Sequence, residues 1–405
     1  IINDDILAII TSMERQMKRN ITLVYILTAL NYSWFWIAIW VLFYLRFTDY
    51  AGIGILESVM ITTSFLGEIP TGAIGDLLEK KKTLIIAFFL CAVGNFTMGL
   101  APSFGILAMG VALTTLGGTF ESGTIQAFVY DSLASIKEQE KYEKILGNLS
   151  SVRMTALGMV SIIGGYLYTI SPGLPFIVLS VFQVTAGILS FFLHEPPIDS
   201  EVFSLKNYLS QTKQGFQQLF KTHEVKLQNS FIIALTMITV ISGQILIDTQ
   251  LVAEGWSARE LGIITVIMFI LSAGFEQLTP WVSKKFGQWN GFILSATVIA
   301  STMIFVPVVG IVFGTIMIIT RNGVGEVFGN SASVMINNTT ESKYRATTLS
   351  TYTMLSNIPY VLTAYFIGYY MDVWSVHGVT AVLGVVLTII VFGAFIKKPK
   401  VVPVM

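Results

Sequence analysis

The feature that most constrains this chain is a series of long apolar runs. Each run holds about 20 mostly apolar residues, the length that crosses a bilayer as an α-helix. Strands of a membrane β-barrel would be about 10 residues long and would alternate in polarity, and the sequence lacks that pattern. Twelve runs lie near residues 21–45, 52–76, 83–101, 104–130, 145–169, 174–193, 228–251, 259–283, 289–310, 311–337, 346–372 and 377–396. The sequence therefore predicts an all-α membrane protein with twelve transmembrane helices.

Charged residues support this prediction by their scarcity and by their positions. They make up 12% of the 405 residues, whereas soluble domains carry about 25%. Of the 24 Lys and Arg residues, 20 lie in the N-terminal stretch, in one alternate set of loops and in the C-terminal tail. Because basic loops stay on the cytoplasmic side, we expect a multi-pass protein of the cell (inner or plasma) membrane with both termini cytoplasmic. The 24 acidic residues balance the basic ones, which argues against a nucleic-acid partner.

The polar stretches divide the chain into four expected parts. Residues 1–20 form an amphipathic segment that we expect to lie along the inner leaflet. Residues 21–194 and 228–405 would form two six-helix halves. Between them, residues 195–227 carry a helical apolar stripe, which predicts a cytoplasmic linker with an interfacial helix. Because the chain starts with Ile1, we expect an initiator methionine, and further residues, to precede it.

A weak internal repeat relates the two halves. The segment 118–121 (GTFE) returns as 323–326 (GVGE), and the segment 149–154 (LSSVRM) returns as 349–354 (LSTYTM). The matches occur in the same order and at nearly the same separation, as a duplication of six helices requires. The alternative is coincidence among segments drawn from few residue types. A duplication would make the halves pseudo-symmetric, with the same orientation in the membrane.

Ionisable residues inside the predicted spans indicate a polar interior. Such residues cost about 2.5–3.5 kcal/mol on insertion, so they usually face a cavity or a partner. They are Glu57, Glu68, Glu121, Arg153, Asp248, Glu276, Arg321 and Glu326. The spans near 83–101, 174–193, 289–310 and 377–396 have none between their ends. We therefore expect these four helices to be lipid-facing scaffold and the other helices to line the interior.

Two acids near the middle of their spans, Glu121 and Glu326, are candidates for proton coupling or substrate binding, together with Arg153 and Arg321. A carboxyl group exposed to each side in turn can load and release a proton, and a nearby Arg changes its proton affinity. We expect Arg153 to reach an acid on a neighbouring helix, with Glu121 the first candidate. The alternative is a permanent ion pair that locks helices together. Residues expected to line a cavity are Asn31, Tyr32, Trp34, Trp36, Gln126, Asp248, Glu276, Asn322 and Asn357.

The segment 67–84 reads GEIPTGAIGDLLEKKKTL. It resembles the loop between helices 2 and 3 of the major facilitator superfamily, whose usual pattern is G-x-L-A-D-R-x-G-R-K. Four positions match that pattern, namely Gly72, Asp76, Lys80 and Lys81, and two others depart from it. The resemblance implies that this loop is a cytoplasmic latch in which Lys80 or Lys81 pairs with Asp131. The implied gate residues are Glu68, Gly72, Asp76, Lys80, Lys81 and Asp131.

The layout of six plus six helices extends the resemblance over the whole chain. Gly164 and Gly165 in the fifth span resemble part of the G-x-x-x-G-P-x-x-G-G pattern of drug/proton antiporters in this superfamily. The Pro of that pattern is replaced by Ser161, and no Arg stands beside Glu121 in the fourth span. The resemblance thus implies a bacterial-type member that is similar to these antiporters but departs from their motif.

These features predict a secondary active transporter that works by alternating access. Its substrate would be a small amphipathic or organic molecule, and we expect export coupled to protons. A lipid or glycolipid flippase and a proton-coupled importer are alternatives within this class, and a non-transporting receptor or scaffold is the alternative of another class. With one Cys, three His and no convergent catalytic set, we expect no enzyme, cofactor or metal site. We expect a monomer whose partners are its substrate, protons and the lipid bilayer.

Overall fold

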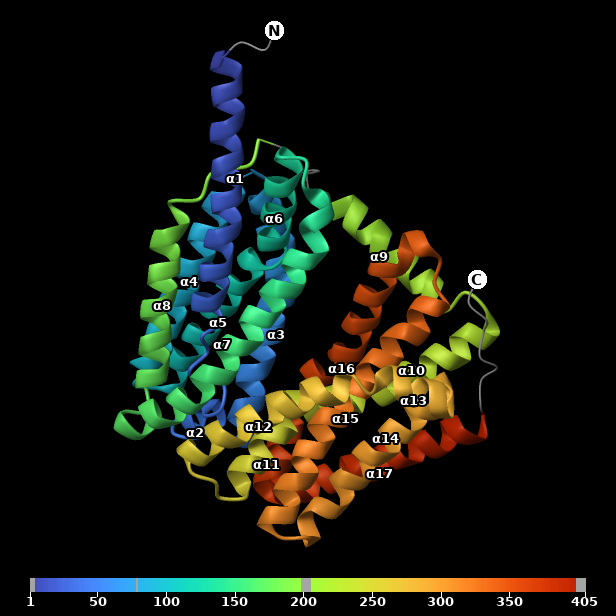
Figure 1. Ribbon diagram of the computed structural model, residues 1–405. Coiled ribbons are helices and arrows are strands. Elements are labelled where there is room, and N and C mark those ends of the chain that lie inside the picture. The colour runs from blue at the N-terminus through green and yellow to red at the C-terminus, as the bar shows by residue number, and fades with distance from the viewer. Residues whose placement is uncertain (1–3, 78, 198–204, 398–405) are drawn as a thin grey trace. The chain divides into compact units, whose positions relative to one another are not determined.

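The computed structural model describes residues 4–77, 79–197 and 205–397, and it describes side-chain surroundings for 11–67, 79–197 and 209–397. Every regular element in these ranges is a helix (Figure 1), which confirms the predicted all-α class. Nine helices of the described chain are long and apolar enough to cross a membrane. The chain is therefore a multi-span membrane protein.

Three of the twelve predicted spans are not among these nine. α8 (Leu174–Ser190) is apolar but only 17 residues long. α16 (Arg345–Val373) is long, but Thr, Ser, Tyr and Asn residues interrupt its apolar sequence. α1 (Asp4–Asn31) starts in the charged N-terminal segment. Polar residues are expected in a span that faces other helices or a cavity rather than lipid.

The chain forms two compact units. Unit 1 comprises the described parts of Ile1–Phe43 and Val59–Ser204, and unit 2 comprises those of Tyr44–Ser58 and Leu205–Met405. Unit 1 takes in most of residues 21–194, and unit 2 takes in residues 228–405. The difference is the segment 44–58, which was expected in the first half but packs with unit 2.

Contacts of α3 (Tyr50–Leu77) with α16 explain why this segment belongs to unit 2. The two carboxylate oxygens of Asp372 accept hydrogen bonds from the backbone N–H groups of Tyr50 (3.1 Å) and Ala51 (2.9 Å). A Cβ on Gly368 would lie 2.0 Å from the carbonyl oxygen of Tyr50, so the helices approach at a glycine. Asp372 thus caps the N-terminus of α3, where backbone N–H groups lack partners within the helix.

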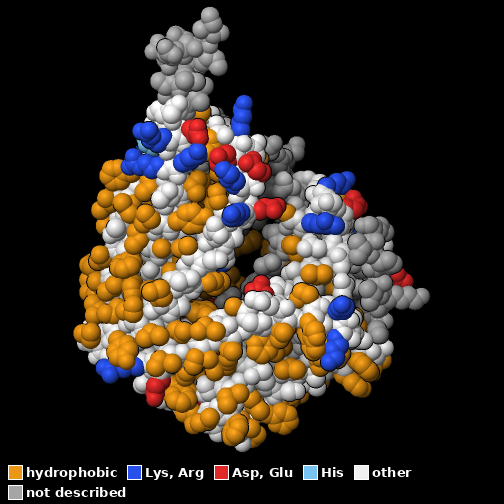
Figure 2. Space-filling view, in the orientation of Figure 1, with side chains coloured by type: hydrophobic (Ala, Val, Ile, Leu, Met, Phe, Trp, Pro, Cys, Tyr) orange, Lys and Arg blue, Asp and Glu red, His pale blue; other side chains and the backbone are white. Residues whose placement is uncertain are grey.

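Unit 1 is a bundle of helices around an apolar core. It contains α1, most of α2 (Trp40–Tyr44), the second part of α3, α4 (Lys80–Gly99), α5 (Phe104–Glu121), α6 (Thr124–Ser135), η1 (Gln139–Lys141), α7 (Tyr142–Ile170) and α8. α4 packs against both α5 and α8, and Leu27, Phe88, Phe128 and Leu193 are fully buried. Figure 2 shows hydrophobic side chains over the sides of this bundle, with Lys and Arg side chains gathered toward one end. An apolar flank with charged residues at one end suits a bundle surrounded by lipid.

Unit 2 contains the first part of α3 and a second set of helices. These are α9 (Leu205–Leu219), α10 (His223–Ile241), η2 (Ser242–Leu246), α11 (Ile247–Ala253), α12 (Ala258–Glu276), α13 (Thr279–Phe286), α14 (Gln288–Phe305), η3 (Val306–Val308), α15 (Ile311–Asn338), η4 (Ser342–Tyr344), α16 and α17 (Val376–Ile396). α14 packs against α15 and α17. α9 comes from the predicted linker and packs against α16 of the same unit.

Three predicted spans are broken helices. The first stops at Asn31 and resumes as α2 (Trp40–Tyr44), the fourth is divided between α5 and α6, and the seventh contains the π-helical turn η2. Between α5 and α6, Gly123 has a φ of +78°, which glycine adopts without strain. Irregular backbone in a span is tolerated where it lines a cavity or is buried in protein.

The first break also corrects an expected boundary. α1 is one continuous helix from Asp4 to Asn31, so the amphipathic segment and the first predicted span are not separate helices. Asn20, at the expected boundary, is fully buried. Its side chain donates to the carbonyl oxygen of His194 at 2.7 Å and accepts from the His194 N–H at 2.9 Å. These contacts hold α1 to the segment that follows α8.

Candidate functional site

The break in the first span places a run of aromatic residues inside unit 1. Residues 32–39 form turns rather than a helix. A glycine on α7 allows this chain segment to pass closely, since a Cβ on Gly164 would lie 1.7 Å from the carbonyl oxygen of Phe35. The Trp34 and Trp36 rings are stacked, with centroids 5.2 Å apart and an angle of 12° between their planes. Tyr32 lies against Trp34 at 5.4 Å, and Trp36 stacks on Phe176 of α8 at 6.2 Å.

This aromatic run lines two cavities of about 380 and 580 Å³, both in unit 1. The two cavities share Tyr32, Trp34, Gly118, Glu121 and Ser122. The smaller one is also lined by Asn31, Trp36, Asn95 and Gln183, and the larger one by Gln126, Ser150 and Arg153. Glu121 and six other residues of the first half that were predicted to line a cavity or to take part in coupling thus lie around one pair of cavities.

Glu121, Tyr32 and Arg153 form the charged part of this site. The Tyr32 hydroxyl donates to Oε2 of Glu121 at 3.4 Å, and Cζ of Arg153 lies 5.4 Å from the centroid of the Tyr32 ring. The expected direct ion pair between Arg153 and Glu121 is absent among the described side chains, and Tyr32 contacts both residues instead. A phenol can donate to an ionised carboxylate or accept from a protonated one. The contact therefore accommodates both protonation states of Glu121.

A chain of buried amides lines the smaller cavity and was missed in the sequence. Nδ2 of Asn95 donates to Oε1 of Gln183 at 3.0 Å, and Nε2 of Gln183 donates to Oδ1 of Asn31 at 3.2 Å. Asn95 lies on α4 and Gln183 on α8, the two helices of this unit that were expected to be lipid-facing scaffold. That expectation is wrong for these two faces. The uncharged amides Asn95 and Gln183 within apolar spans were the sequence signal for this polar face, and a search for charged residues overlooks them.

The indole N–H of Trp36 is a further donor in this region. It is buried and has no hydrogen-bond partner among the described residues. Trp36 also lines the smaller cavity. A buried indole N–H normally finds an acceptor. The site therefore combines stacked aromatic faces, a donor, a row of amides and one carboxylate, which suits a molecule with an aromatic part and polar groups.

The predicted coupling residues of the second half lie in unit 2. Arg321 and Glu326 of α15 line a cavity of about 250 Å³ together with Asn322. Asn322 donates to Oγ of Ser272 at 2.7 Å. Arg321 is 2% exposed, whereas the Glu326 side chain is exposed. The matched glutamates of the internal repeat differ in local structure, because Glu121 ends α5 while Glu326 lies within the continuous helix α15.

The remaining predicted lining residues of unit 2 lie elsewhere. Glu276 ends α12, is exposed and accepts from Nδ2 of Asn330 at 3.4 Å. Asn357 donates to the carbonyl oxygen of Thr353 in its own helix. Asp248 lies in the first turn of α11. None of the three is among the residues that line the cavity at Arg321.

The predicted gate residues fall partly within the described chain. Nζ of Lys80 pairs with Oδ2 of Asp131 at 2.8 Å, so Lys80 rather than Lys81 makes the implied ion pair. Glu68, Gly72 and Asp76 lie outside the residues whose side chains are described. The backbone N–H groups of Lys80 and Lys81 donate to the Glu195 carboxylate at 2.9 and 2.8 Å, which caps α4. Burial raises the pKa of Glu195, and these two hydrogen bonds partly offset that rise.

An all-α chain with many apolar spans and two compact units defines a polytopic membrane protein. The sequence profile of the Major Facilitator Superfamily matches residues 21–331. The chain belongs to this superfamily and is a secondary transporter rather than an enzyme.

Similarity to curated relatives covers only part of each chain. D-xylose-proton symporter-like 1 of Arabidopsis thaliana is 27% identical over 135 residues (31% of this chain, 26% of that protein). Quinolone resistance protein NorA of Staphylococcus aureus is 25% identical over 148 residues (36% and 34%). The MFS-type transporter YxaM of Bacillus subtilis is 22% identical over 162 residues (40% and 40%). The chain thus matches about a quarter to two fifths of the length of these relatives.

Solved structures resemble this chain over nearly its full length. The nucleoside transporter NupG has a TM-score of 0.73 and 16% identity, and the match covers 96% of this chain and all of that one (100%). A bacterial homologue of the iron transporter ferroportin has a TM-score of 0.71 and 11% identity, with 95% and 98% covered. At these identities the likeness establishes the fold and does not indicate a substrate.

Proposed function

We propose that this secondary transporter exports a small aromatic or amphipathic organic molecule in exchange for protons. The observation that carries the proposal is the meeting of stacked Trp34 and Trp36 with the Glu121 carboxylate around one pair of cavities. Aromatic faces bind the apolar part of such a molecule through stacking. The carboxylate and the amides orient its polar groups.

Glu121 is the proposed proton carrier of this site. Its hydrogen-bond partner is the Tyr32 phenol, and the Arg153 guanidinium lies 5.4 Å from the centroid of the Tyr32 ring and makes no ion pair with the carboxylate among the described side chains. The carboxylate is therefore free to bind a positively charged or donor group of the substrate, and protonation would end that interaction. Substrate and proton then compete for one group, which is the simplest basis for exchange.

Two of the curated relatives that match part of this chain support different parts of the proposal. NorA is described as a quinolone resistance protein, which supports a drug-like substrate, and a second relative is described as a proton symporter-like protein, which supports proton coupling. Those two descriptions differ in the direction they suggest. Export is preferred here because the aromatic site suits an amphipathic molecule, and import is the alternative outcome of the test.

Reconstituted vesicles provide that test. Purified protein in proteoliposomes is exposed to a pH gradient of either sign, and uptake of a fluorescent aromatic dye is followed. We expect dye movement opposite to the proton gradient, and we expect Glu121→Gln to abolish the gradient dependence. Glu143→Gln, an exposed acid on α7, is the matched control and should transport like the wild type. Unchanged gradient dependence in Glu121→Gln would remove Glu121 from the mechanism, and dye movement along the proton gradient would establish import.

We further propose that both termini lie in the cytoplasm of the cell membrane, since most basic residues lie in the termini and one set of loops. A single cysteine at Lys144 or at Arg46, in a Cys91→Ser background, reports the side of each loop. A membrane-impermeant thiol reagent applied to intact cells should label Arg46→Cys and spare Lys144→Cys. The reverse pattern would contradict the proposed orientation.

The Lys80–Asp131 pair is proposed as part of a cytoplasmic gate, and a monomer as the transporting unit. The pair joins the start of α4 to α6. Charges at such a position can hold one state closed and release it in the other. Asp76 is assigned to the same gate by its place in the sequence motif. Asp76→Asn should slow turnover more than it weakens substrate binding, and turnover equal to that of the wild type would exclude Asp76 from the gate.

A further inference from the structure

Arg321 of α15 is a buried guanidinium with no carboxylate partner among the residues that the structure describes. It is 2% exposed, and its Nη2 donates to Oε1 of Gln250. Its Nε and Nη1 have no hydrogen-bond partner among the described residues. The side chain lines the cavity of about 250 Å³ in unit 2, which also presents Thr239, Ser242 and Asn322 and, with an exposed side chain, Glu326. Buried charges are normally paired, because removal from water is costly. The arrangement therefore favours a ligand with a negative charge.

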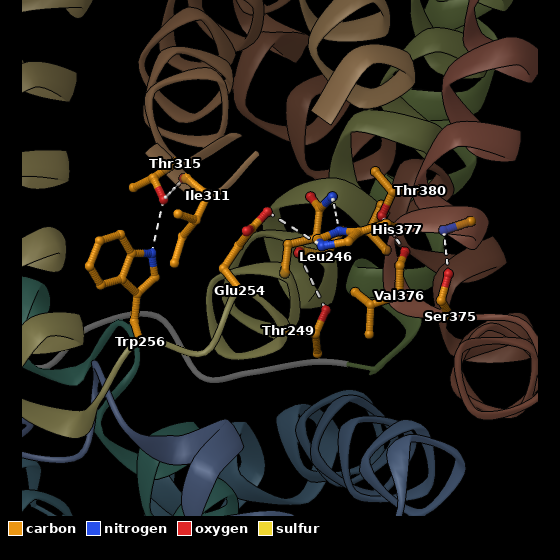
Figure 3. A network of polar contacts seen from close by, with 12 residues as sticks. Leu246, Thr249, Glu254, Trp256, Ile311, Thr315, Ser375, Val376, His377 and Thr380 are labelled. Carbon is orange, nitrogen blue, oxygen red and sulfur yellow. Dashed lines mark hydrogen bonds and ion pairs between the residues drawn. The ribbon is translucent and has the colours of Figure 1, made fainter. Parts of the chain in front are cut away.

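The partner of Arg321 belongs to a chain of hydrogen bonds whose directions are determined. Because a guanidinium can only donate, the bond from Arg321 requires Oε1 of Gln250 to accept. The Nε2 amide of Gln250 lies 3.3 Å from Nδ1 of His377. An amide nitrogen donates, so Nδ1 of His377 must accept and cannot carry a proton. Nε2 of His377 then carries the proton and faces Oε1 of Glu254 at 3.4 Å (Figure 3).

Protonation of His377 conflicts with this chain at one contact. A proton on Nδ1 would place two donors, that nitrogen and Nε2 of Gln250, against each other. Gln250 can restore the contact by rotating its amide, but its oxygen then turns away from Arg321. The protonated ring keeps a favourable partner, because Glu254 is next to Nε2. Protonation of His377 and the Gln250 contact with Arg321 therefore exclude each other.

The charged groups on the elements around His377 are few. Glu254 faces it directly, and Arg321 faces it through Gln250. α14, η2 and η3 contain no ionisable side chain, and those of α10 (His223, Glu224 and Lys226) lie in its first turns. On α16, Asp372 caps α3, and on α11 Asp248 is the ionisable residue. Within α17 itself His377 is the sole ionisable residue.

We propose that Arg321 is a binding site for a compact monovalent anion, either the carboxylate of an organic molecule or a halide, and that a proton on His377 strengthens this binding by withdrawing Gln250. A guanidinium holds a carboxylate through a fork of two parallel N–H groups, and it offers two such forks, both of which include Nη2. Gln250 occupies one hydrogen of Nη2. Anion and proton therefore bind together. The site lies in unit 2 and uses neither Glu121 nor the aromatic run, so it is independent of the proposed exchange.

Binding to the purified full-length protein in lipid nanodiscs tests the proposal. Sodium benzoate and sodium chloride are titrated separately against a sulfate background between about pH 6 and 8. Thermal stabilisation gives the affinity, and a weakly buffered sample gives the protons taken up. If one proton accompanies each anion, affinity should rise by up to about tenfold per unit fall in pH. Stabilisation by benzoate alone identifies a carboxylate, and stabilisation by chloride identifies a halide. Stabilisation by neither anion at pH 6 overturns the proposal.

Three variants separate the two parts of the site. Arg321→Gln should abolish anion binding at every pH, and His377→Gln should bind with the affinity of the wild type at pH 8 and lose the pH slope. Gln250→Leu leaves Arg321 without its acceptor, so it should bind tightly at both ends of the pH range. His223→Gln, at the exposed start of α10, is the control and should keep the wild-type slope. If Arg321→Gln fails to fold, the other variants decide. A wild-type slope in His377→Gln or in Gln250→Leu contradicts the coupling, and wild-type affinity in a folded Arg321→Gln contradicts the site.

Discussion

The Tyr32 hydroxyl donates a hydrogen bond to Glu121 at 3.4 Å, while the Tyr32 ring lies 5.4 Å from the Arg153 guanidinium. One aromatic residue therefore contacts both charged groups of the unit 1 site, and these two groups make no direct ion pair among the described side chains. A direct ion pair would satisfy both charges and leave neither available to a ligand. The contact through Tyr32 leaves a carboxylate and a cation on the same cavity wall.

Removal of the Tyr32 hydroxyl should separate proton coupling from aromatic binding. A hydrogen bond to a charged group contributes about 1.5–3 kcal/mol, so we expect Tyr32→Phe to lower proton-driven transport by roughly tenfold. The ring is retained, so affinity for an aromatic dye should change by less than about threefold. Transport and binding are measured in parallel in proteoliposomes. Tyr130→Phe, an exposed tyrosine of the same unit, should behave like the wild type, and an equal loss in both Tyr variants would contradict the specific role of Tyr32.

Much of the unit 1 site follows from polarity along the sequence. Glu121 and Arg153 stand out as charges in apolar spans, and Tyr32, Trp34 and Trp36 stand out as a dense aromatic run. All five line the same pair of cavities. Their contacts could not be predicted, because they depend on which way each helix faces after packing. Polarity alone could not show that Tyr32 would contact both charges.

Two other features were beyond the reach of sequence patterns. The buried amides Asn95 and Gln183 lie on helices without internal charges, so a rule based on charge assigned those helices to the lipid. The break between α5 and α6 depends on the positive φ of Gly123. A glycine in a span also serves close helix contacts, as Gly164 does. The residue type therefore does not reveal which of the two roles applies.

The amide chain provides a stability prediction. Gln183→Leu would remove the acceptor of Asn95 and the donor to Asn31, and both partners are buried. Each buried polar group left unsatisfied costs about 1–3 kcal/mol, so we expect a clearly lower Tm in detergent. Gln277→Leu, at the exposed end of α12, is the control and should change the Tm little. A wild-type Tm in Gln183→Leu would show that the amide chain does not stabilise unit 1.

Two glycines of α7 offer a matched pair. A Cβ on Gly164 would lie 1.7 Å from the carbonyl oxygen of Phe35, whereas a Cβ on Gly158 would meet nothing within 4 Å. Gly164→Ala should therefore displace the aromatic run, lower the Tm and weaken dye binding. Gly158→Ala should be neutral or should stabilise the helix by about 0.5–1 kcal/mol, because alanine is the better helix former. Equal behaviour of the two variants would contradict the close approach of α7 to residue 35.

The raised pKa of Glu195 predicts a pH dependence of stability. Burial raises this pKa above its ordinary value of 4.5, so the folded protein favours the protonated carboxyl more than the unfolded chain does. The resulting stabilisation is complete below the ordinary pKa and is lost as the pH rises through the raised value. Glu195→Gln cannot titrate. The wild-type Tm should therefore fall relative to that of Glu195→Gln as the pH rises from about 4, whereas the exposed control Glu341→Gln should track the wild type. Parallel Tm curves for wild type and Glu195→Gln would contradict the shift.

Loss of the Lys80–Asp131 ion pair should cost more stability than loss of a neighbouring exposed ion pair. Its side chains are 14% and 7% exposed, whereas those of the neighbouring Lys82–Glu79 pair are 58% and 51% exposed. Loss of one partner of a buried pair costs about 3–5 kcal/mol, and the partial exposure of Lys80 lowers our expectation for Asp131→Asn to about 1–3 kcal/mol. Glu79→Gln breaks an exposed pair and should cost about 0–1 kcal/mol. Replacing both buried partners, in Lys80→Met with Asp131→Leu, should recover much of the stability because no charge is left alone. Tm measurements on the three variants test this order, and a double variant less stable than Asp131→Asn would show that the pair itself stabilises the start of α4.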